Sequence, residues 1–148
     1  MTILGGFAGG ERTRAERDPV VNLAILSGDL NADDVPIDNQ LWMNTTDSAL
    51  HVVRGDAVSA SAVLDGFTIR RGSAELRTET DDDTGGNMLL VDASPVIARC
   101  VLRDGFASEG GAGVAIVGGA PSFVDCLFQD NRTWNYGAGA MARRRAAL

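Results

Sequence analysis

A short stretch of sequence occurs three times in this chain, and this internal repeat constrains the fold more than any other feature. Residues 95–105 read PVIARCVLRDG and residues 121–131 read PSFVDCLFQDN, 26 positions later, while residues 63–72 read VLDGFTIRRG. A fixed period of this length indicates stacked structural units that share one core. Three columns of the alignment are apolar in every copy: Leu64, Ile97 and Phe123, then Phe67, Cys100 and Cys126, then Ile69, Leu102 and Phe128.

The spacing of these apolar columns predicts two short strands in each copy. The last two apolar positions lie two residues apart, as a strand with one buried face requires. The first apolar position lies three residues earlier, and this break in parity predicts a corner at residues 98–99 and again at residues 124–125. Gly72, Gly105 and Asn131 end the three copies, and we expect them to adopt positive φ because Gly and Asn do so most easily.

Glycine-rich segments lie between the copies and repeat with them. GGNMLLV begins at residue 85, GGAGVAI at residue 110 and GAGAM at residue 137. A unit of about 26 residues is too short for a strand–helix–strand crossover, which needs about 30 or more, and we find no helical period between the strands. All three apolar columns are buried together when each unit is one coil of a solenoid, with strands of successive coils stacked in parallel about 4.8 Å apart. We therefore predict an all-β solenoid.

This period also predicts how the chain is divided. Residues 3–141 hold about five coils at this period, and residues 142–148 form an irregular basic tail. The first two copies are 33 positions apart and the next two 26, so we place an inserted loop at about residues 73–84. We expect the solenoid to be incomplete at both ends. Because open end strands are templates for pairing, we also expect self-association through these ends.

The order of the segments resembles right-handed parallel β-helix proteins of the pectate-lyase-like superfamily. More narrowly, it resembles bacterial surface proteins with the polymorphic outer-membrane protein repeat, which pairs a Gly-Gly-small-aliphatic segment with a Phe-x-x-Asn segment. The first is matched loosely at residues 110–114, and the second fully at residues 128–131. The resemblance implies a right-handed parallel β-helix, and in such families the fold says little about activity. The other segments that carry it are GGFAGGE (5–11), ILSGDLNADD (25–34), HVV (51–53), LDGFTIRRG (64–72) and SPVIARCVL (94–102).

Charge and hydropathy exclude several classes of protein. The net charge of −7 argues against a nucleic-acid surface, which needs a basic stripe. No stretch of the sequence approaches the ~20 apolar residues of a membrane-spanning helix, so we expect no membrane span. The first residues lack the basic and apolar regions of an export signal. We therefore expect no nucleic-acid partner and no export signal encoded in this chain.

One turn has the residue types of a calcium site. In GDLNADD, Asp29, Asn31 and Asp33 alternate as oxygen ligands do at the start of a calcium-binding loop. The pattern departs from an EF-hand loop, because Asp34 stands where that loop requires Gly. An Asp-rich and Asn-rich turn whose side chains bond their own backbone explains the same residues. Calcium is the only cofactor that the sequence suggests, with Asp29, Asn31 and Asp33 as its candidate ligands and the turn as the alternative.

Catalytic sets are harder to assemble from this sequence. Enzymes of this fold that act on polysaccharides need clustered carboxylates with calcium and a basic residue, or a carboxylate pair about 5 to 9.5 Å apart. The repeat places no two of the strand-associated acids in one column, and His51, the only histidine, excludes a multi-histidine site. Cys100 and Cys126 share a column; stacked side chains point the same way, which favours free thiols over a disulfide. The strand-associated acids are Asp65, Asp92, Asp104 and Asp125.

We therefore expect a structural and adhesive role. The chain is interpreted as a β-helix segment of a secreted or cell-surface bacterial protein, at the outer membrane or outside the cell, with no catalysis. Its expected partners are surface glycans or host and cell-surface proteins. The alternative is a carbohydrate-active β-helix enzyme, a polysaccharide lyase or glycoside hydrolase, or a remnant of one.

Overall fold

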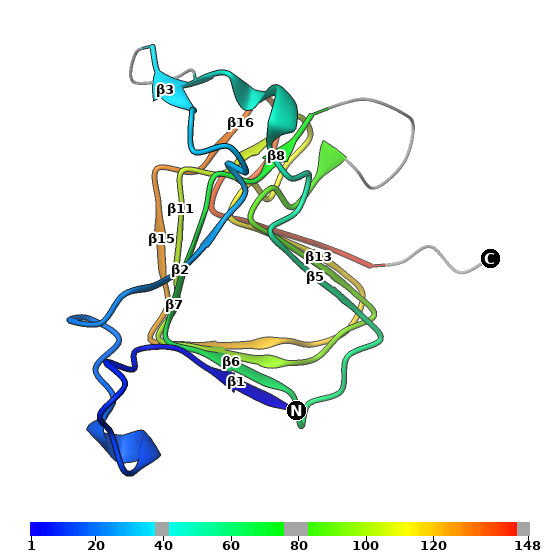
Figure 1. Cartoon of the computed structure of the whole chain (residues 1–148). Helices are drawn as coiled ribbons and strands as arrows, with labels where there is room; N and C mark the ends of the chain where they lie inside the picture. Colours follow the sequence, from blue (N-terminus) through cyan, green and yellow to red (C-terminus); the bar gives the residue numbers. More distant parts are fainter. Residues whose placement is uncertain (38–41, 76–82, 145–148) are drawn as a thin grey trace.

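The computed structural model describes residues 1–37, 42–75 and 83–144, which form an all-β protein with two short 3-10 helices (Figure 1). Four sheets consist of parallel strands, and the fifth is an antiparallel pair of two-residue strands. Sheet 1 contains β1 (Thr2–Leu4), β6 (Val63–Asp65), β10 (Val96–Ala98) and β14 (Ser122–Val124), and sheet 2 contains β2 (Ala24–Ser27), β7 (Phe67–Arg70), β11 (Val101–Arg103) and β15 (Leu127–Gln129). Sheet 3 contains β8 (Ser73–Ala74), β12 (Phe106–Ala107) and β16 (Arg132–Thr133), and sheet 4 contains β5 (Val53–Asp56), β9 (Met88–Val91), β13 (Val114–Val117) and β17 (Ala140–Arg143). The antiparallel pair is β3 (Val35–Pro36) with β4 (Trp42–Met43), and the 3-10 helices are η1 (Arg14–Glu16) and η2 (Thr45–Asp47).

The strand registers confirm the alignment of the repeat. In sheet 1, Ile97 is the register partner of both Leu64 and Phe123. In sheet 2, Leu102 is the partner of both Ile69 and Phe128. The glycine-rich segments pair in the same way in sheet 4, with steps of 26 residues between β9, β13 and β17. The prediction of an all-β fold with parallel strands is thus confirmed, although the strands form separate sheets and none of the sheets is curled.

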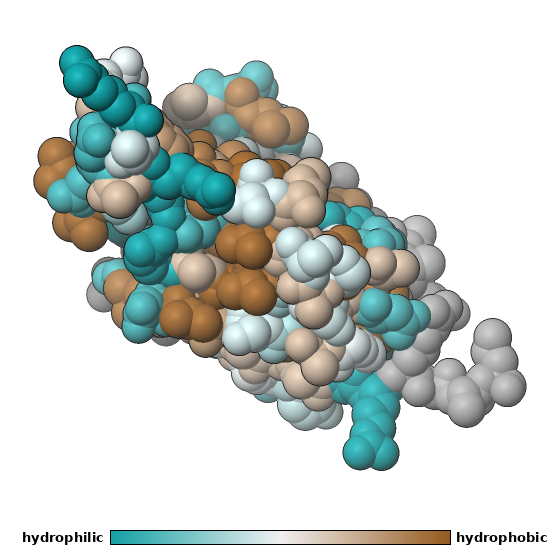
Figure 2. All heavy atoms as spheres, turned by 90° about the horizontal axis from the view of Figure 1, so that it is seen from below, coloured by the Kyte–Doolittle hydropathy of each residue, from teal (hydrophilic) through white to brown (hydrophobic). Residues whose placement is uncertain are grey.

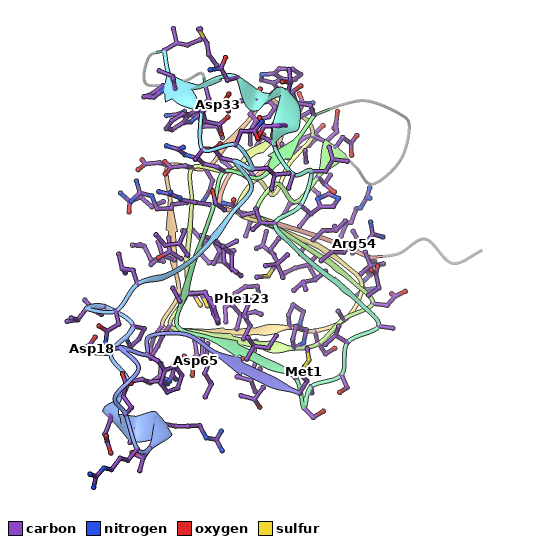
Figure 3. The ribbon with its side chains drawn as sticks, viewed as in Figure 1. Met1, Asp18, Asp33, Arg54, Asp65 and Phe123 are labelled. Atoms are coloured by element: carbon purple, nitrogen blue, oxygen red, sulfur yellow. The ribbon has the colours of Figure 1, made fainter. Side chains whose placement is uncertain are left out.

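The core lies between sheets 1, 2 and 4, which Figure 1 shows around a common interior. Ile69, Met88, Leu102 and Val114 are each at most 1% exposed, and the labelled Phe123 lies inside the space between the sheets (Figure 3). Burial of one such side chain contributes about 1.5–3 kcal/mol. Like apolar residues from successive strands therefore stack on one another, and this stacking is what the repeat encodes.

The corners between the sheets use residues with positive φ at repeated positions. Gly66, Arg99 and Asp125 have φ of +82°, +47° and +52° at the corner between sheets 1 and 2, so the corners predicted at residues 98–99 and 124–125 are confirmed. The prediction of positive φ at Gly72, Gly105 and Asn131 was wrong by one residue. At this second corner, between sheets 2 and 3, the residues with positive φ are Arg71, Asp104 and Asp130, with φ of +58°, +53° and +53°.

Gly72 and Gly105 instead serve close approach between segments. A Cβ placed on Gly72 lies 1.7 Å from the Gly86 carbonyl oxygen, and one on Gly105 lies 2.5 Å from the Ala112 carbonyl oxygen. Asn131 uses its side chain rather than its backbone, because Asn131 Nδ2 donates to the Leu102 carbonyl at 2.7 Å and its Oδ1 accepts from the Gly105 N–H at 3.0 Å. The repeat found the right residues but assigned them the wrong role.

Two predicted boundaries differ from the structure. Of the loop placed at residues 73–84, residues 73 and 74 form strand β8, and residues 76–82 lie outside the described residues. β17 reaches Arg143, so it extends two residues into the tail predicted at residues 142–148. Residues 145–148 of this tail lie outside the described residues. Within the described part of the chain, no helix has the length and apolarity needed to span a bilayer.

Candidate functional site

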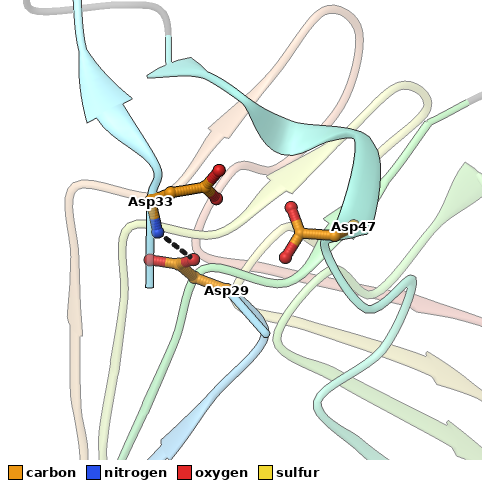
Figure 4. Close-up of side chains that lie close together, drawn as sticks. All are labelled: Asp29, Asp33 and Asp47. Carbon is orange, nitrogen blue, oxygen red and sulfur yellow. Dashed lines mark hydrogen bonds between the residues drawn. The ribbon is translucent and has the colours of Figure 1, made fainter. Parts of the chain in front are cut away.

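Three carboxylates come together beside the end of β2. Asp29, Asp33 and Asp47 each offer a carboxylate oxygen, and these oxygens lie within 4.8 Å of one another (Figure 4). Asp29 and Asp33 belong to the predicted triplet. Asn31 contributes its backbone N–H, which donates to Asp47 Oδ2 at 2.8 Å. Sequence reasoning missed Asp47, which lies in η2, because nothing in the turn indicates that η2 folds back over it.

The buried member of this group is already neutralised by an arginine. Arg71 Nη1 donates to Asp29 Oδ2 at 2.6 Å, and only 2% of the Asp29 side chain is exposed. The Asp33 N–H donates to Asp29 Oδ1 at 3.1 Å. Burial raises the pKa of Asp29, but the hydrogen bonds from Arg71 and Asp33 outweigh it, so the pKa lies below its ordinary value.

The bonding of this group fits a hydrogen-bonded turn better than a calcium site. Calcium takes 6–8 oxygen ligands, whereas two of these carboxylates already accept hydrogen bonds from backbone N–H groups and a guanidinium lies among them. Asp33 and Asp47 keep further carboxylate oxygens for a cation. Calcium binding at Asp29, Asn31 and Asp33 stays a prediction, and the structure brings Asp47 beside the two carboxylates of this triplet.

Arg71 also attaches the segment that contains β3, β4 and η2, which we call the overhang, to the sheets. Its guanidinium carbon lies 4.3 Å from the centre of the Trp42 ring, within the range of a cation–π contact. Figure 1 shows that the segment containing β3 and η2 lies above sheet 3, which contains β8 and β16. Arg71 therefore joins three parts of the chain: the corner after β7, the turn after β2, and strand β4.

A cavity opens beneath this overhang, next to Arg71. Its volume is about 90 Å³, and it lies between the overhang, the corners that follow β7 and β11, and Arg132 and Trp134 at strand β16. Trp42, Phe106 and Trp134 supply aromatic walls, and Phe106 and Trp134 make an edge-to-face contact with ring centres 5.2 Å apart. The cavity is assembled from four distant segments, and no local pattern signals it.

Asp34, which also lines this cavity, has an unusual pKa. Burial, followed by the nearby charge of Asp29, raises the pKa of Asp34 to about 6, and Arg71 opposes the shift. In the unfolded chain an Asp titrates near 3.9. Between about pH 4 and pH 6 the folded chain therefore binds a proton at Asp34 that the unfolded chain does not. The free energy of unfolding consequently falls as the pH rises through this window.

We expect Asp34→Asn to stabilise the chain at pH 7.5, by up to about 1 kcal/mol after allowance for the partial exposure of the carboxyl group. The advantage over wild type is expected to disappear near pH 4, where the wild-type carboxyl group is protonated in the folded state. Urea unfolding at both pH values measures this difference. Asp18→Asn, which changes an exposed carboxylate and keeps its Oδ1 acceptor for the Val20 N–H, serves as the matched control. Equal or lower stability of Asp34→Asn at pH 7.5 would contradict this assignment.

Asp65, the first of the predicted strand-associated acids, forms an ion-pair cluster instead of a catalytic pair. Arg17 and Arg99 both donate to its carboxylate, and the side chains of Arg17 and Asp65 are 6% and 9% exposed. Burial raises the pKa of Asp65, but the hydrogen bonds from Arg99 and Arg17 lower it below its ordinary value. An ionised, doubly paired carboxylate is unsuited to donating a proton.

Figure 2, which views the molecule from below, shows hydrophobic and hydrophilic residues interspersed on the face that it presents.

The other strand-associated acids and the two cysteines lie apart from the cavity or at its rim. Asp104 lines the cavity and accepts from Arg103 Nε at 2.8 Å, while Asp92 and Asp125 are exposed residues with positive φ at corners. Cys100 and Cys126 are free thiols, as the column argument favoured, and burial raises the pKa of both. Raised thiol pKa values make these cysteines poor nucleophiles at neutral pH.

Comparison of the chain with protein-family models, with curated proteins and with solved structures finds no match in any of the three. The class of protein is therefore defined by the structure alone: an all-β chain of parallel sheets, with an aromatic-lined cavity beneath an overhanging segment.

Proposed function

We propose that this chain is a right-handed parallel β-helix segment with a structural and adhesive role and no catalysis. The observation that carries the proposal is the repeated register: one position in β6, β10 and β14, and one in β7, β11 and β15, hold stacked apolar residues. Three successive passages of the chain enter sheets 1, 2, 3 and 4 in the same order. In such an architecture each coil contacts only its neighbours, which produces a stiff rod.

The place and partners that we propose follow from this architecture. A stiff rod that displays loops suits a secreted or outer-membrane surface protein that contacts surface glycans or cell-surface proteins. Strands β14 and β15 are last in their sheets, and Val124 and Leu127 on them are 45% and 52% exposed. Exposed apolar residues on edge strands support self-association through these edges.

A carbohydrate-active enzyme is the alternative function, and one observation favours it. Asp34, with its pKa raised to about 6, lines the same cavity as Glu75 and Asp104. A carboxyl group whose pKa is raised toward neutral pH, beside other carboxyl groups, is the arrangement that general acid catalysis uses. Release of reducing or unsaturated sugar ends from polysaccharides, abolished in Asp34→Asn, would favour this alternative over the adhesive role.

Adhesion by the purified chain tests the proposed function. We expect beads coated with the chain to bind bacterial or host cell surfaces, and to bind them less after glycosidase treatment of the cells if glycans are the partners. Beads coated with the same mass of the thermally unfolded chain are the control. Binding no stronger than that of the control would contradict the adhesive role.

A further inference from the structure

Three residues that line the cavity beneath the overhang each hold a buried polar atom without a hydrogen bond. Asp34 Oδ1, Ser48 Oγ and Arg71 Nε are buried, and none of them has a hydrogen-bond partner among the described residues. The side chains of all three line the cavity, and Ser48 as a whole is only 9% exposed. A buried polar group without a partner costs about 1–3 kcal/mol, so three at one place call for an explanation.

These three atoms differ in what they require of a ligand. Arg71 Nε can only donate, because a guanidinium has no acceptor atom, and Nη1 of the same group is already engaged by Asp29. The ionised Asp34 carboxylate can only accept, and the Ser48 hydroxyl can do both. A hydroxyl group is the simplest partner that donates to one of these atoms and accepts from another. A ligand that carries several hydroxyl groups on neighbouring carbons matches the set.

The aromatic walls add an apolar surface next to this polar end. Trp134 is 69% exposed although it packs edge-to-face on Phe106, and Trp42 carries the Arg71 guanidinium at 4.3 Å from its ring centre. An exposed indole beside hydrogen-bonding side chains suits a ligand with one apolar and one polar face, because the ring buries C–H groups while the polar groups take the hydroxyls.

The charge around the cavity argues against a negatively charged ligand. Glu75 and Arg132 are charged residues of opposite sign that line it, while Asp104 is paired with Arg103 and Arg71 with Asp29. Asp34, when it is ionised, adds one negative charge to this lining, so the cavity disfavours a negatively charged ligand. The volume of about 90 Å³ also exceeds by several fold the ~10–15 Å³ that one water requires.

We propose that this cavity binds one neutral pyranose unit of a glycan, with its C–H face against Trp134 and its neighbouring hydroxyls at Asp34, Ser48 and Arg71. The inference rests on the proposed adhesive function for its biological role and names the ligand of that function. It assigns binding and no bond cleavage.

Tryptophan fluorescence tests the proposal directly, because Trp42 and Trp134 are the only two tryptophans of the chain and both line the cavity. We expect the emission of the intact chain to change saturably when methyl glucoside, methyl galactoside or methyl mannoside is added, with a Kd of about 1 mM for at least one of them, as is reasonable for a single small ligand. Methyl glucuronide, which is negatively charged, is expected to bind at least about tenfold more weakly.

Two variants and one control complete the test. Ser48→Ala removes one hydroxyl and Trp134→Ala removes the exposed ring, and each is expected to weaken binding of the methyl glycoside at least about fivefold. Tyr136→Ala, which changes an exposed aromatic residue that does not line the cavity, is expected to leave the Kd unchanged. Circular dichroism checks that each variant is folded. The absence of a saturable change with all three neutral glycosides, or an unchanged Kd in both Ser48→Ala and Trp134→Ala, overturns the proposal.

The adhesion assay separates the two claims. Beads coated with Trp134→Ala that adhere as well as wild type, together with no glycoside binding by wild type, would overturn the cavity inference and leave the adhesive role standing. Saturable glycoside binding without adhesion would support the cavity inference and overturn the adhesive role.

Discussion

Gly72→Ala is expected to destabilise the chain by at least about 3 kcal/mol, and to leave it largely unfolded if its total stability is small. A Cβ at this position lies 1.7 Å from the Gly86 carbonyl oxygen and 2.4 Å from its carbonyl carbon. Both neighbours are backbone atoms, so the clash is relieved only if the corner after β7 separates from the segment that leads into β9. Thermal and urea unfolding followed by circular dichroism measure the loss.

Gly10→Ala is the matched control, because no atom lies within 4 Å of a Cβ built on Gly10. We expect this variant to unfold within about 0.5 kcal/mol of wild type, as substitutions away from packed features do. Similar unfolding midpoints for Gly72→Ala and Gly10→Ala would contradict the close approach at the corner, and with it the packing of residue 72 against residue 86.

Asn87→Ala is the second large effect, with an expected loss of about 3 kcal/mol. The Asn87 side chain is completely buried; its Oδ1 accepts from the Gly72 N–H at 3.1 Å, and its Nδ2 donates to the Arg103 carbonyl at 2.9 Å and to Asn131 Oδ1 at 3.0 Å. Removal of the amide leaves the Gly72 N–H, the Arg103 carbonyl and Asn131 Oδ1 without these hydrogen bonds inside the protein. Urea unfolding at constant pH measures the difference in free energy.

The control for this prediction is Asn135→Ala. Asn135 is exposed, and its Nδ2 makes one hydrogen bond, to Glu109 Oε1 at 3.0 Å. We expect a loss below about 0.5 kcal/mol. If Asn87→Ala cost no more than Asn135→Ala, the buried amide would not join three segments of the chain as described.

The repeat predicted the strand registers because stacked apolar columns leave a direct trace in the sequence. Ile97 and Leu102 stand where the repeat places them, and their partners were named correctly 26 and 33 positions away. Corner conformation was harder to predict. The positive φ falls on Arg71 and Asp104, and Arg has no strong preference for this conformation. The residue after each of them must be Gly because another segment approaches it closely.

The candidate site was less predictable because it is assembled from non-repeated segments. Asp29 and Asp33 carried a local pattern, but the ion pair between Asp29 and Arg71 joins residues 42 positions apart. Asn87 lies in the glycine-rich segment, where only its burial reveals its role. A cavity formed by an overhang follows from the path of a loop, and loop paths are set by tertiary contacts that the repeat does not encode.

The parallel stacking of segments 26 and 33 residues apart is the central claim, and a nuclear Overhauser spectrum of the isotopically labelled chain tests it most directly. We expect parallel-strand contacts between the backbones of β11 and β15, between those of β11 and β7, and between those of β13 and both β9 and β17. Contacts that connect these strands in antiparallel order, or no contacts between residues 26 apart in a folded chain, would contradict the stacked architecture and the β-helix proposed from it.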